Sequence, residues 1–71
     1  MMSAKECLKN ARYKLSMTQK EFAAFLGINQ ATVCLYEGGL RYPGLRLTRI
    51  IVEKLKKKNI NITYDDLRND K

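Results

Sequence analysis

The feature that most constrains how this chain folds is a pair of short helical patterns separated by only three residues. Thr18 precedes a pattern that ends at Leu26, and a glutamate follows it three residues later, the spacing of a capping box at a helix start. Gly27 comes directly after this pattern, where glycine adopts a positive φ angle without steric cost. Asn29 is a favoured N-cap for a second helix over residues 30–37. We therefore expect two short helices with a tight turn between them.

The segments on either side of this pair also have helical periodicity. Residues 3–14 carry one apolar stripe, and Ser3 with Glu6 has the spacing of another capping box. Residues 45–58 form a longer amphipathic pattern that ends in a cluster of lysines, and cations suit the C-terminal end of a helix dipole. The inward positions expected along this last helix are Leu47, Ile50, Ile51 and Leu55.

The C-terminal segment predicts one more turn of helix. Thr63 and Asp66 have capping-box spacing, so we expect a single turn that ends at Arg68 and places Leu67 on the core. β-branched residues are too scattered to indicate strands. We therefore predict an all-α fold of four to five helices. A chain of 71 residues forms one compact domain and has no room for a second.

The amino-acid composition narrows the classes of function that we expect for this chain. Fourteen Lys and Arg residues against seven Asp and Glu give a net charge of +7, which favours a polyanionic partner such as nucleic acid. The chain has no histidine, which removes the usual general base and most zinc sites, so we expect no enzyme, no cofactor and no metal. Two cysteines fit a reducing compartment, and no signal peptide or membrane-spanning stretch is evident. We expect a cytoplasmic protein without a membrane partner.

The central pattern resembles the Cro and phage-repressor (Xre-type) helix-turn-helix family. The resemblance runs from about Lys5 to Leu55, and Arg12 matches it seven residues before Gln19. It implies a lambda-repressor-like DNA-binding domain over residues 1–58, with the motif at about 18–38, followed by a tail over residues 59–71. The matched positions read Thr18-Gln19-x-x-Phe22-Ala23-x-x-Leu26-Gly27-Ile28-Asn29-Gln30-x-Thr32-Val33-x-x-Tyr36-Glu37-x-Gly39.

The resemblance implies that the second helix of the motif reads DNA bases in the major groove. Carried over by position, the readers are Gln30, Ala31 and Thr32, with Leu35 one turn later. A glutamine amide can pair with adenine, and the methyl groups of alanine and threonine can pack on a thymine methyl. Gln30 taken alone is better explained as a surface residue at a helix start, and only its place in the family register favours base contact. Leu35 departs from the polar residue common in the family, so it either contacts a thymine methyl or is an exposed leucine without a role.

The resemblance also implies contacts with the DNA backbone. Helix N-termini bind phosphate through free N–H groups, and cations and phenols are common phosphate donors. Within the motif, Gln19 is further expected to brace Gln30. An ion pair between Arg12 and Glu37 is implied as a structural tie, with an additional phosphate contact by Arg12 or two unrelated surface charges as the alternatives. The expected backbone contacts are Thr18, Gln19, Asn29, Gly38, Arg41, Tyr42 and Arg46.

These features favour a sequence-specific regulator that binds double-stranded DNA, a Cro-like repressor that occupies an operator and obstructs transcription. The family usually binds as a homodimer, with half-sites roughly 34 Å apart. Ile60, Ile62 and the tail are the candidate dimer surface, and the tail is expected to hold the short final helix. The alternative is an antitoxin that binds its toxin through the tail and regulates its own promoter. A nonspecific chromatin-like protein is disfavoured by the Gln-Ala-Thr pattern.

Two further residues and one lysine cluster also have expected roles. Cys34 is expected to pack as a small residue on the reading helix. Phe25 either covers the edge of the core or marks a subunit contact. The lysines at 56–58 are expected to form a solvated helix end, with a secondary DNA contact as the alternative.

Overall fold

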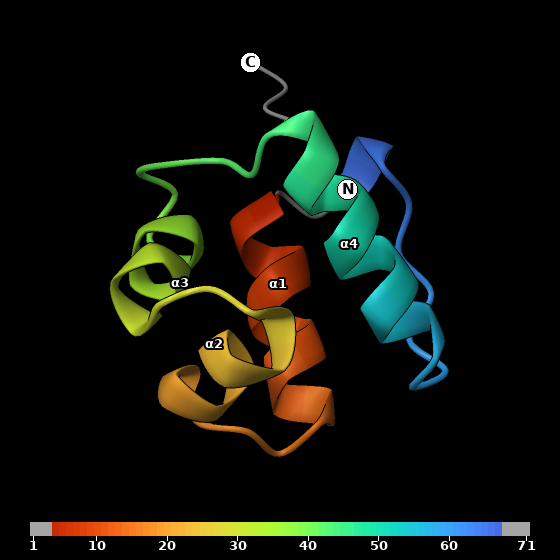
Figure 1. Ribbon diagram of the computed structural model, residues 1–71, viewed down its shortest axis with the longest axis horizontal. Helices are drawn as coiled ribbons and strands as arrows, with labels where there is room; N and C mark the ends of the chain where they lie inside the picture. Colours follow the sequence, from red (N-terminus) through yellow and green to blue (C-terminus); the bar gives the residue numbers. More distant parts are fainter. Residues whose placement is uncertain (1–3, 68–71) are drawn as a thin grey trace.

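The computed structural model describes residues 4–67, and all of its regular structure is helical (Figure 1). This confirms the predicted all-α class within the described range. The helices are α1 (Ala4–Lys14), α2 (Gln19–Leu26), α3 (Gln30–Glu37) and α4 (Leu45–Lys56), followed by the single 3₁₀ turn η1 (Asp65–Leu67). The predicted N-cap Ser3 and the predicted end of the last turn at Arg68 lie outside the described residues.

Local hydrogen bonds at the start of α2 and α3 explain why both helices are so short. Thr18 accepts the N–H of Glu21 on its side chain while Glu21 accepts the N–H of Thr18, so the predicted capping box is complete. Gly27 ends α2 in the left-handed region with φ of 78°. Asn29 caps α3 by accepting the N–H of Thr32. The predicted turn between the two helices is therefore confirmed in detail.

The core gathers apolar side chains from every helix around α1. Figure 1 shows α1 in the middle of the molecule, with α3 on one side and α4 on the other. Phe22, Ala23 and Leu26 of α2 and Val33 and Tyr36 of α3 are all buried. The largest side chains that are almost fully enclosed are Phe22, Leu8, Ile51, Leu55, Leu67 and Val33.

The register of α4 differs from the prediction. Ile50 was expected to face inward, yet 38% of it is exposed, and Thr48 is buried in its place. Thr48, Ile51 and Leu55 share one face of the helix, whereas Ile50 lies on the other side. The hydroxyl group of Thr48 donates to the carbonyl oxygen of Pro43 at 3.4 Å, which satisfies this polar group inside the protein.

The chain leaves α4 earlier than predicted, at Lys56 rather than residue 58. Asn59 has a positive φ of 63°, and the N–H of Ile60 donates to the carbonyl of Leu55 at 2.9 Å. This reversal turns the tail back onto the molecule. Thr63 and Asp66 form the predicted capping box, and Leu67 is fully buried as expected.

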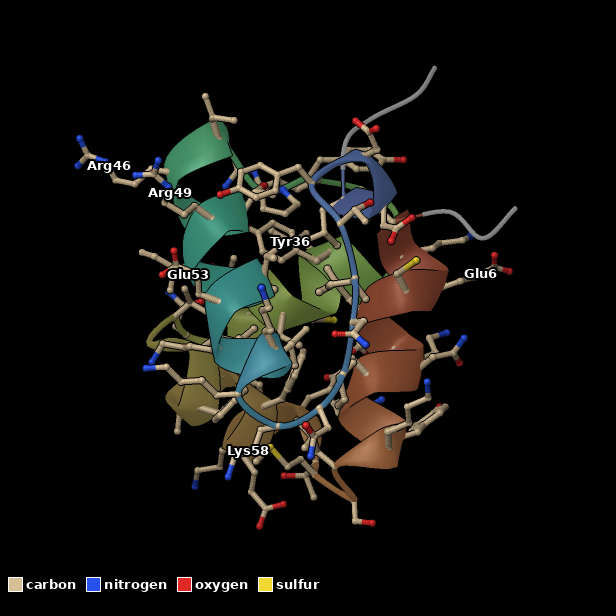
Figure 2. The ribbon with its side chains drawn as sticks, turned by 90° about the vertical axis from the view of Figure 1, so that its right-hand side faces the viewer. Glu6, Tyr36, Arg46, Arg49, Glu53 and Lys58 are labelled. Atoms are coloured by element: carbon tan, nitrogen blue, oxygen red, sulfur yellow. The ribbon has the colours of Figure 1, made fainter. Side chains whose placement is uncertain are left out.

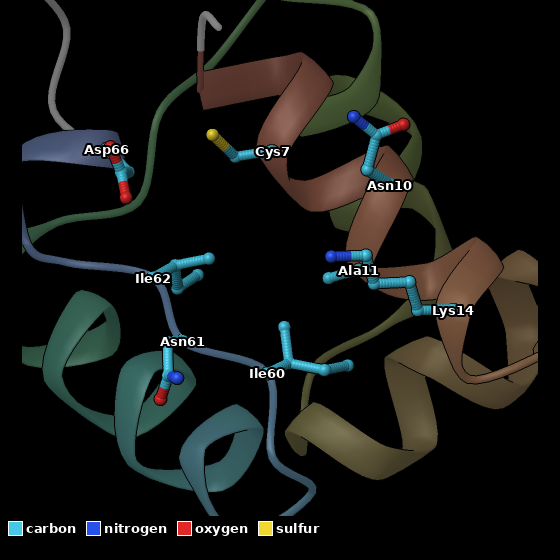
Figure 3. Close-up of a pocket in the computed structure, with 8 residues that line it drawn as sticks. All are labelled: Cys7, Asn10, Ala11, Lys14, Ile60, Asn61, Ile62 and Asp66. Atoms are coloured by element: carbon cyan, nitrogen blue, oxygen red, sulfur yellow. The ribbon is translucent and has the colours of Figure 1, made fainter.

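The returning tail covers the side of α1 and closes the core. Ile60 is only 7% exposed and Ile62 is partly buried against the core, with a small hollow of about 140 Å³ between them and α1 (Figure 3). Ile60 and Ile62, which were expected as part of a dimer surface, are therefore not displayed as a broad apolar surface. Their apolar side chains complete the core of the single chain instead, because four short helices leave one side of α1 uncovered.

Candidate nucleic-acid interface

A hydrogen-bonded network around Glu37 ties three helices together. The predicted ion pair is present: Arg12 of α1 meets Glu37 at the end of α3, with Nε to Oε2 at 2.7 Å and Nη2 to Oε1 at 3.0 Å. Gln19 at the start of α2 donates its side-chain amide to Glu37 Oε1 at 3.2 Å. Arg12 also donates to the carbonyl of Met17, just before α2 begins. One carboxylate thus links the start of α2 to the end of α3.

The network is largely shielded from water. The side chains of Arg12 and Glu37 are 12% and 3% exposed. Donation to Glu37 raises the pKa of Arg12 above its ordinary value, because the hydrogen bond favours the charged guanidinium. Arg12 also lies over the ring of Tyr13, 4.8 Å from its centroid. A bidentate arginine pair in such surroundings holds its partners in one fixed orientation.

This network differs in one respect from the sequence-based expectation. Gln19 was expected to brace Gln30, but the described residues show no hydrogen bond between these two side chains. The Gln19 amide is turned toward Glu37 instead. Gln30 is consequently an exposed side chain without a support of this kind.

The network borders a surface hollow that brings separate parts of the sequence together. The hollow has a volume of about 350 Å³ and is lined from α1, α2 and α3. It joins Gln19 and Gly38, both expected backbone contacts, to the Arg12–Glu37 pair. Its remaining lining was not indicated by the motif: Lys9, Tyr13 and Cys34. Lys9 and Tyr13 lie one helical turn or less from Arg12 on α1, a spacing that could have identified them.

The start of α3 presents the residues expected to read bases. Gln30 and Ala31 are exposed, and Thr32 and Leu35 are half-buried. The hydroxyl group of Thr32 donates to Asn29 Oδ1 at 2.8 Å, so this donor is already used within the chain. Thr32 also carries a methyl group, and the neighbouring Ala31 is small, apolar and exposed. This face can contact a thymine methyl next to a Gln30 amide that is free to pair.

Cys34 is exposed, which corrects the expectation that it packs as a small residue. It lies three residues beyond Ala31 on α3, so helical spacing places both on one face. The sequence pattern missed it because a small apolar side chain in a short helix is as typical of a core position as of a surface. The other cysteine, Cys7, is buried, and this burial together with nearby carboxylates raises the pKa of its thiol.

The expected backbone contacts fall into three groups. Thr18 and Gln19 lie at the start of α2, where first-turn N–H groups lack an acceptor within the helix. The N–H of Gly38 donates to the carbonyl of Cys34 at 2.9 Å, so it is not free to bind an anion. Arg41 is exposed and Tyr42 is half-buried in the segment between α3 and α4. Arg41 lies near Tyr36 and opposes part of the rise that burial causes in the pKa of that phenol.

Arg46 lies apart from the other candidates. Together with Leu45, Arg49 and Tyr64 it lines a different hollow, of about 420 Å³, at the start of α4. Figure 2 shows Arg46 and Arg49 projecting from the same side of this helix. The structure therefore brings Thr18, Gln19 and Asn29 around the α2–α3 pair, but does not bring Arg46 to them.

Phe25 lies at the edge of the core, which is the first of its two expected roles. Its ring stacks on that of Phe22 with centroids 6.3 Å apart, and it packs against the core cluster. Lys54 of α4 donates to the carbonyl of Phe25 at 3.1 Å. This contact holds α2 to α4.

Residues 4–67 contain no cluster of side chains suited to a metal ion, and none of the helices in this range is long and apolar enough to cross a membrane. The candidate surface within this range consists of the two short helices α2 and α3, held in one orientation, with basic residues around them. Comparisons of the chain with protein-family models, curated proteins and solved structures found no match.

Proposed function

We propose that this protein is a sequence-specific regulator that binds double-stranded DNA through the major groove, a Cro-like repressor with a lambda-repressor-like domain. The observation that carries the proposal is the junction at Glu37. It fixes α2 and α3 against each other while the start of α3 remains exposed. A helix held at one end and free at the other suits insertion into a groove, because its orientation is set before binding.

Base reading in this proposal belongs to the start of α3. Gln30 pairs with an adenine through its amide, and Ala31 and the methyl group of Thr32 pack on thymine methyls. The support for this assignment is that the Thr32 hydroxyl already donates to Asn29, so its hydrogen is not available to a base. Leu35 and Cys34 extend this face by one turn.

The residues around the start of α3 contact the DNA backbone in this proposal. The free N–H groups at the start of α2, the exposed Arg41 and the phenol of Tyr42 are donors suited to phosphate oxygens. Lys9 and Tyr13 extend the same surface along α1. We propose that the protein acts as a homodimer on a two-fold symmetric operator, which doubles the number of contacts and the length of sequence read.

Removal of the Gln30 amide tests this function. Gln30→Ala should lose about 1–3 kcal/mol of discrimination at a single base position, while binding to random duplex DNA is preserved. The measurement is fluorescence anisotropy with a preferred duplex, its single-base variants and a random duplex. Asn61→Ala, which removes an exposed amide from the tail, is the matched control and should change neither value. An equal loss on preferred and random DNA would remove Gln30 from the base-reading residues.

A further inference from the structure

The outward face of α4 carries a stripe of four exposed residues, which we call the α4 stripe: Arg46, Arg49, Ile50 and Glu53. Their spacing of three, four and seven residues places them on one side of the helix, opposite the buried Thr48, Ile51 and Leu55. The three labelled charged members, Arg46, Arg49 and Glu53, lie on one side of α4 in Figure 2. Ile50 is the apolar residue that the core leaves outside.

The two ends of the α4 stripe carry opposite charges at equal distances from its middle. It begins with Arg46, has Arg49 and Ile50 in the middle, and ends with Glu53. A two-fold axis between Arg49 and Ile50 would place Arg46 of one copy opposite Glu53 of the other, because the two residues lie equally far from the axis on either side. The same pairing occurs twice across the axis, as in any isologous contact.

We propose that the α4 stripe is the contact surface for a second copy of this chain, with the two α4 helices packed antiparallel. Two reciprocal Arg46–Glu53 pairs set the register. The two Ile50 side chains meet near the axis with the aliphatic stems of the arginines. This surface replaces Ile60 and Ile62, which the core has taken up.

Arg49 lies near the proposed axis and has neighbours of its own chain around it. Tyr64 of the tail and Glu53 raise the pKa of the Arg49 guanidinium above its ordinary value, because both favour the charged form. Arg49 also lines the hollow at the start of α4 together with Tyr64 and Leu45. The exposed Leu45 and Tyr64 side chains flank the stripe and add apolar surface at its rim.

The placement of α3 agrees with such a pair. The α4 stripe points to the left in Figure 2, which is the side that faces the viewer in Figure 1, and α3 lies to the left of α4 in Figure 1. A two-fold axis that runs horizontally in Figure 1 makes the α4 helices antiparallel and leaves both copies of α3 on the left. Both reading helices then share one face of the pair. The use of this pair to place two helices on DNA rests on the proposed function, although the contact between the two copies needs no DNA.

One face of a twelve-residue helix makes a small contact. It falls at the low end of specific interfaces, so we expect self-association at protein concentrations of roughly 10–500 µM without DNA. A weak pair of this kind would become populated on a two-site operator, because each bound copy raises the effective concentration of the next.

The test is sedimentation equilibrium without DNA on wild type, Arg46→Glu, Glu53→Arg and the double variant. Each single variant faces two like-charge pairs and should weaken association at least tenfold. The double variant restores opposite charges and should return to the wild-type level. An equimolar mixture of the two single variants should also associate, because each supplies the charge that the other lacks. Lys58→Glu, off the stripe, is the matched control and should match wild type, and circular dichroism verifies folding.

Three results would overturn the proposal. A wild-type chain that stays monomeric to roughly 1 mM has no such contact. Single variants that associate like wild type place the contact elsewhere, and single variants that no mixture rescues show no Arg46–Glu53 pairing. If Arg46→Glu weakens only DNA binding, Arg46 is a backbone contact instead. Dimers that fail to bind DNA would contradict the proposed function and leave the α4 contact intact.

Discussion

Glu37 is the residue that links the end of α3 to α1 and to the start of α2. Its carboxylate receives two hydrogen bonds from Arg12 and one from Gln19, and these three residues come from three different helices. The buried carboxylate would be costly without these donors, and the shielded guanidinium would be costly without the carboxylate. The network therefore stabilises one arrangement more strongly than its single contacts suggest.

At this scale we predict that Glu37→Ala destabilises the fold by about 3 kcal/mol, because the shielded Arg12 loses its partner. Urea denaturation followed by circular dichroism measures the free energy of unfolding. The double variant Arg12→Met/Glu37→Leu removes both charges and should recover most of the loss. A single variant that costs under about 0.5 kcal/mol would show that the pair is a surface contact of little energetic weight.

At the scale of elements, the sequence predicted best where the signal is local. Thr18, Gly27 and Asn29 each act on a backbone group a few residues away. Their roles in starting and ending helices could therefore be predicted from the sequence. The sequence did not predict which face of α4 is buried, because both Thr48 and Ile50 fit a helical period. Which of them is buried depends on where α1 and the tail lie, and that is a property of tertiary packing.

The turn between α2 and α3 gives a prediction at this scale. Gly27 has φ of 78°, and a Cβ atom there would meet no atom within 4 Å, so Gly27→Ala carries a backbone cost alone. We expect a loss of about 1 kcal/mol in the free energy of unfolding. Gly44 is the matched control, because its surroundings are equally open and its φ is −70°. Thermal unfolding compares the two, and equal effects at both glycines would contradict the backbone explanation.

At the scale of the whole molecule, most of the positive charge lies away from α3. The segment from Leu45 to Lys58 holds six of the fourteen cations and one acid, whereas α3 holds no cation at all. The position of Gln30, Ala31 and Thr32 together at the start of α3 was predictable, because their spacing from the Asn29 cap is local. The hollow that joins Lys9 and Tyr13 to Gln19 was not predictable from the sequence, because it depends on how α1 crosses the other two helices.

The exposed Arg41 gives the prediction for this scale. Arg41→Ala should weaken binding to preferred and random duplexes alike, and the slope of log affinity against log salt should fall by about one unit, because one phosphate contact is lost. Anisotropy titrations between about 50 and 200 mM salt measure the slope. Asn61→Ala, which changes an exposed residue of the tail, is the control and should leave it unchanged. A slope unaltered by Arg41→Ala would remove this residue from the backbone contacts.

The central claim is that the exposed start of α3 reads the sequence of double-stranded DNA. Selection of bound sites from a pool of random duplexes tests it most directly, since the protein itself chooses the operator from all sequences offered. We predict enrichment of a two-fold symmetric sequence whose half-sites lie about one helical turn apart and contain an adenine that Gln30→Ala no longer selects. A pool that remains random after repeated selection, although the protein binds duplex DNA, would contradict the claim.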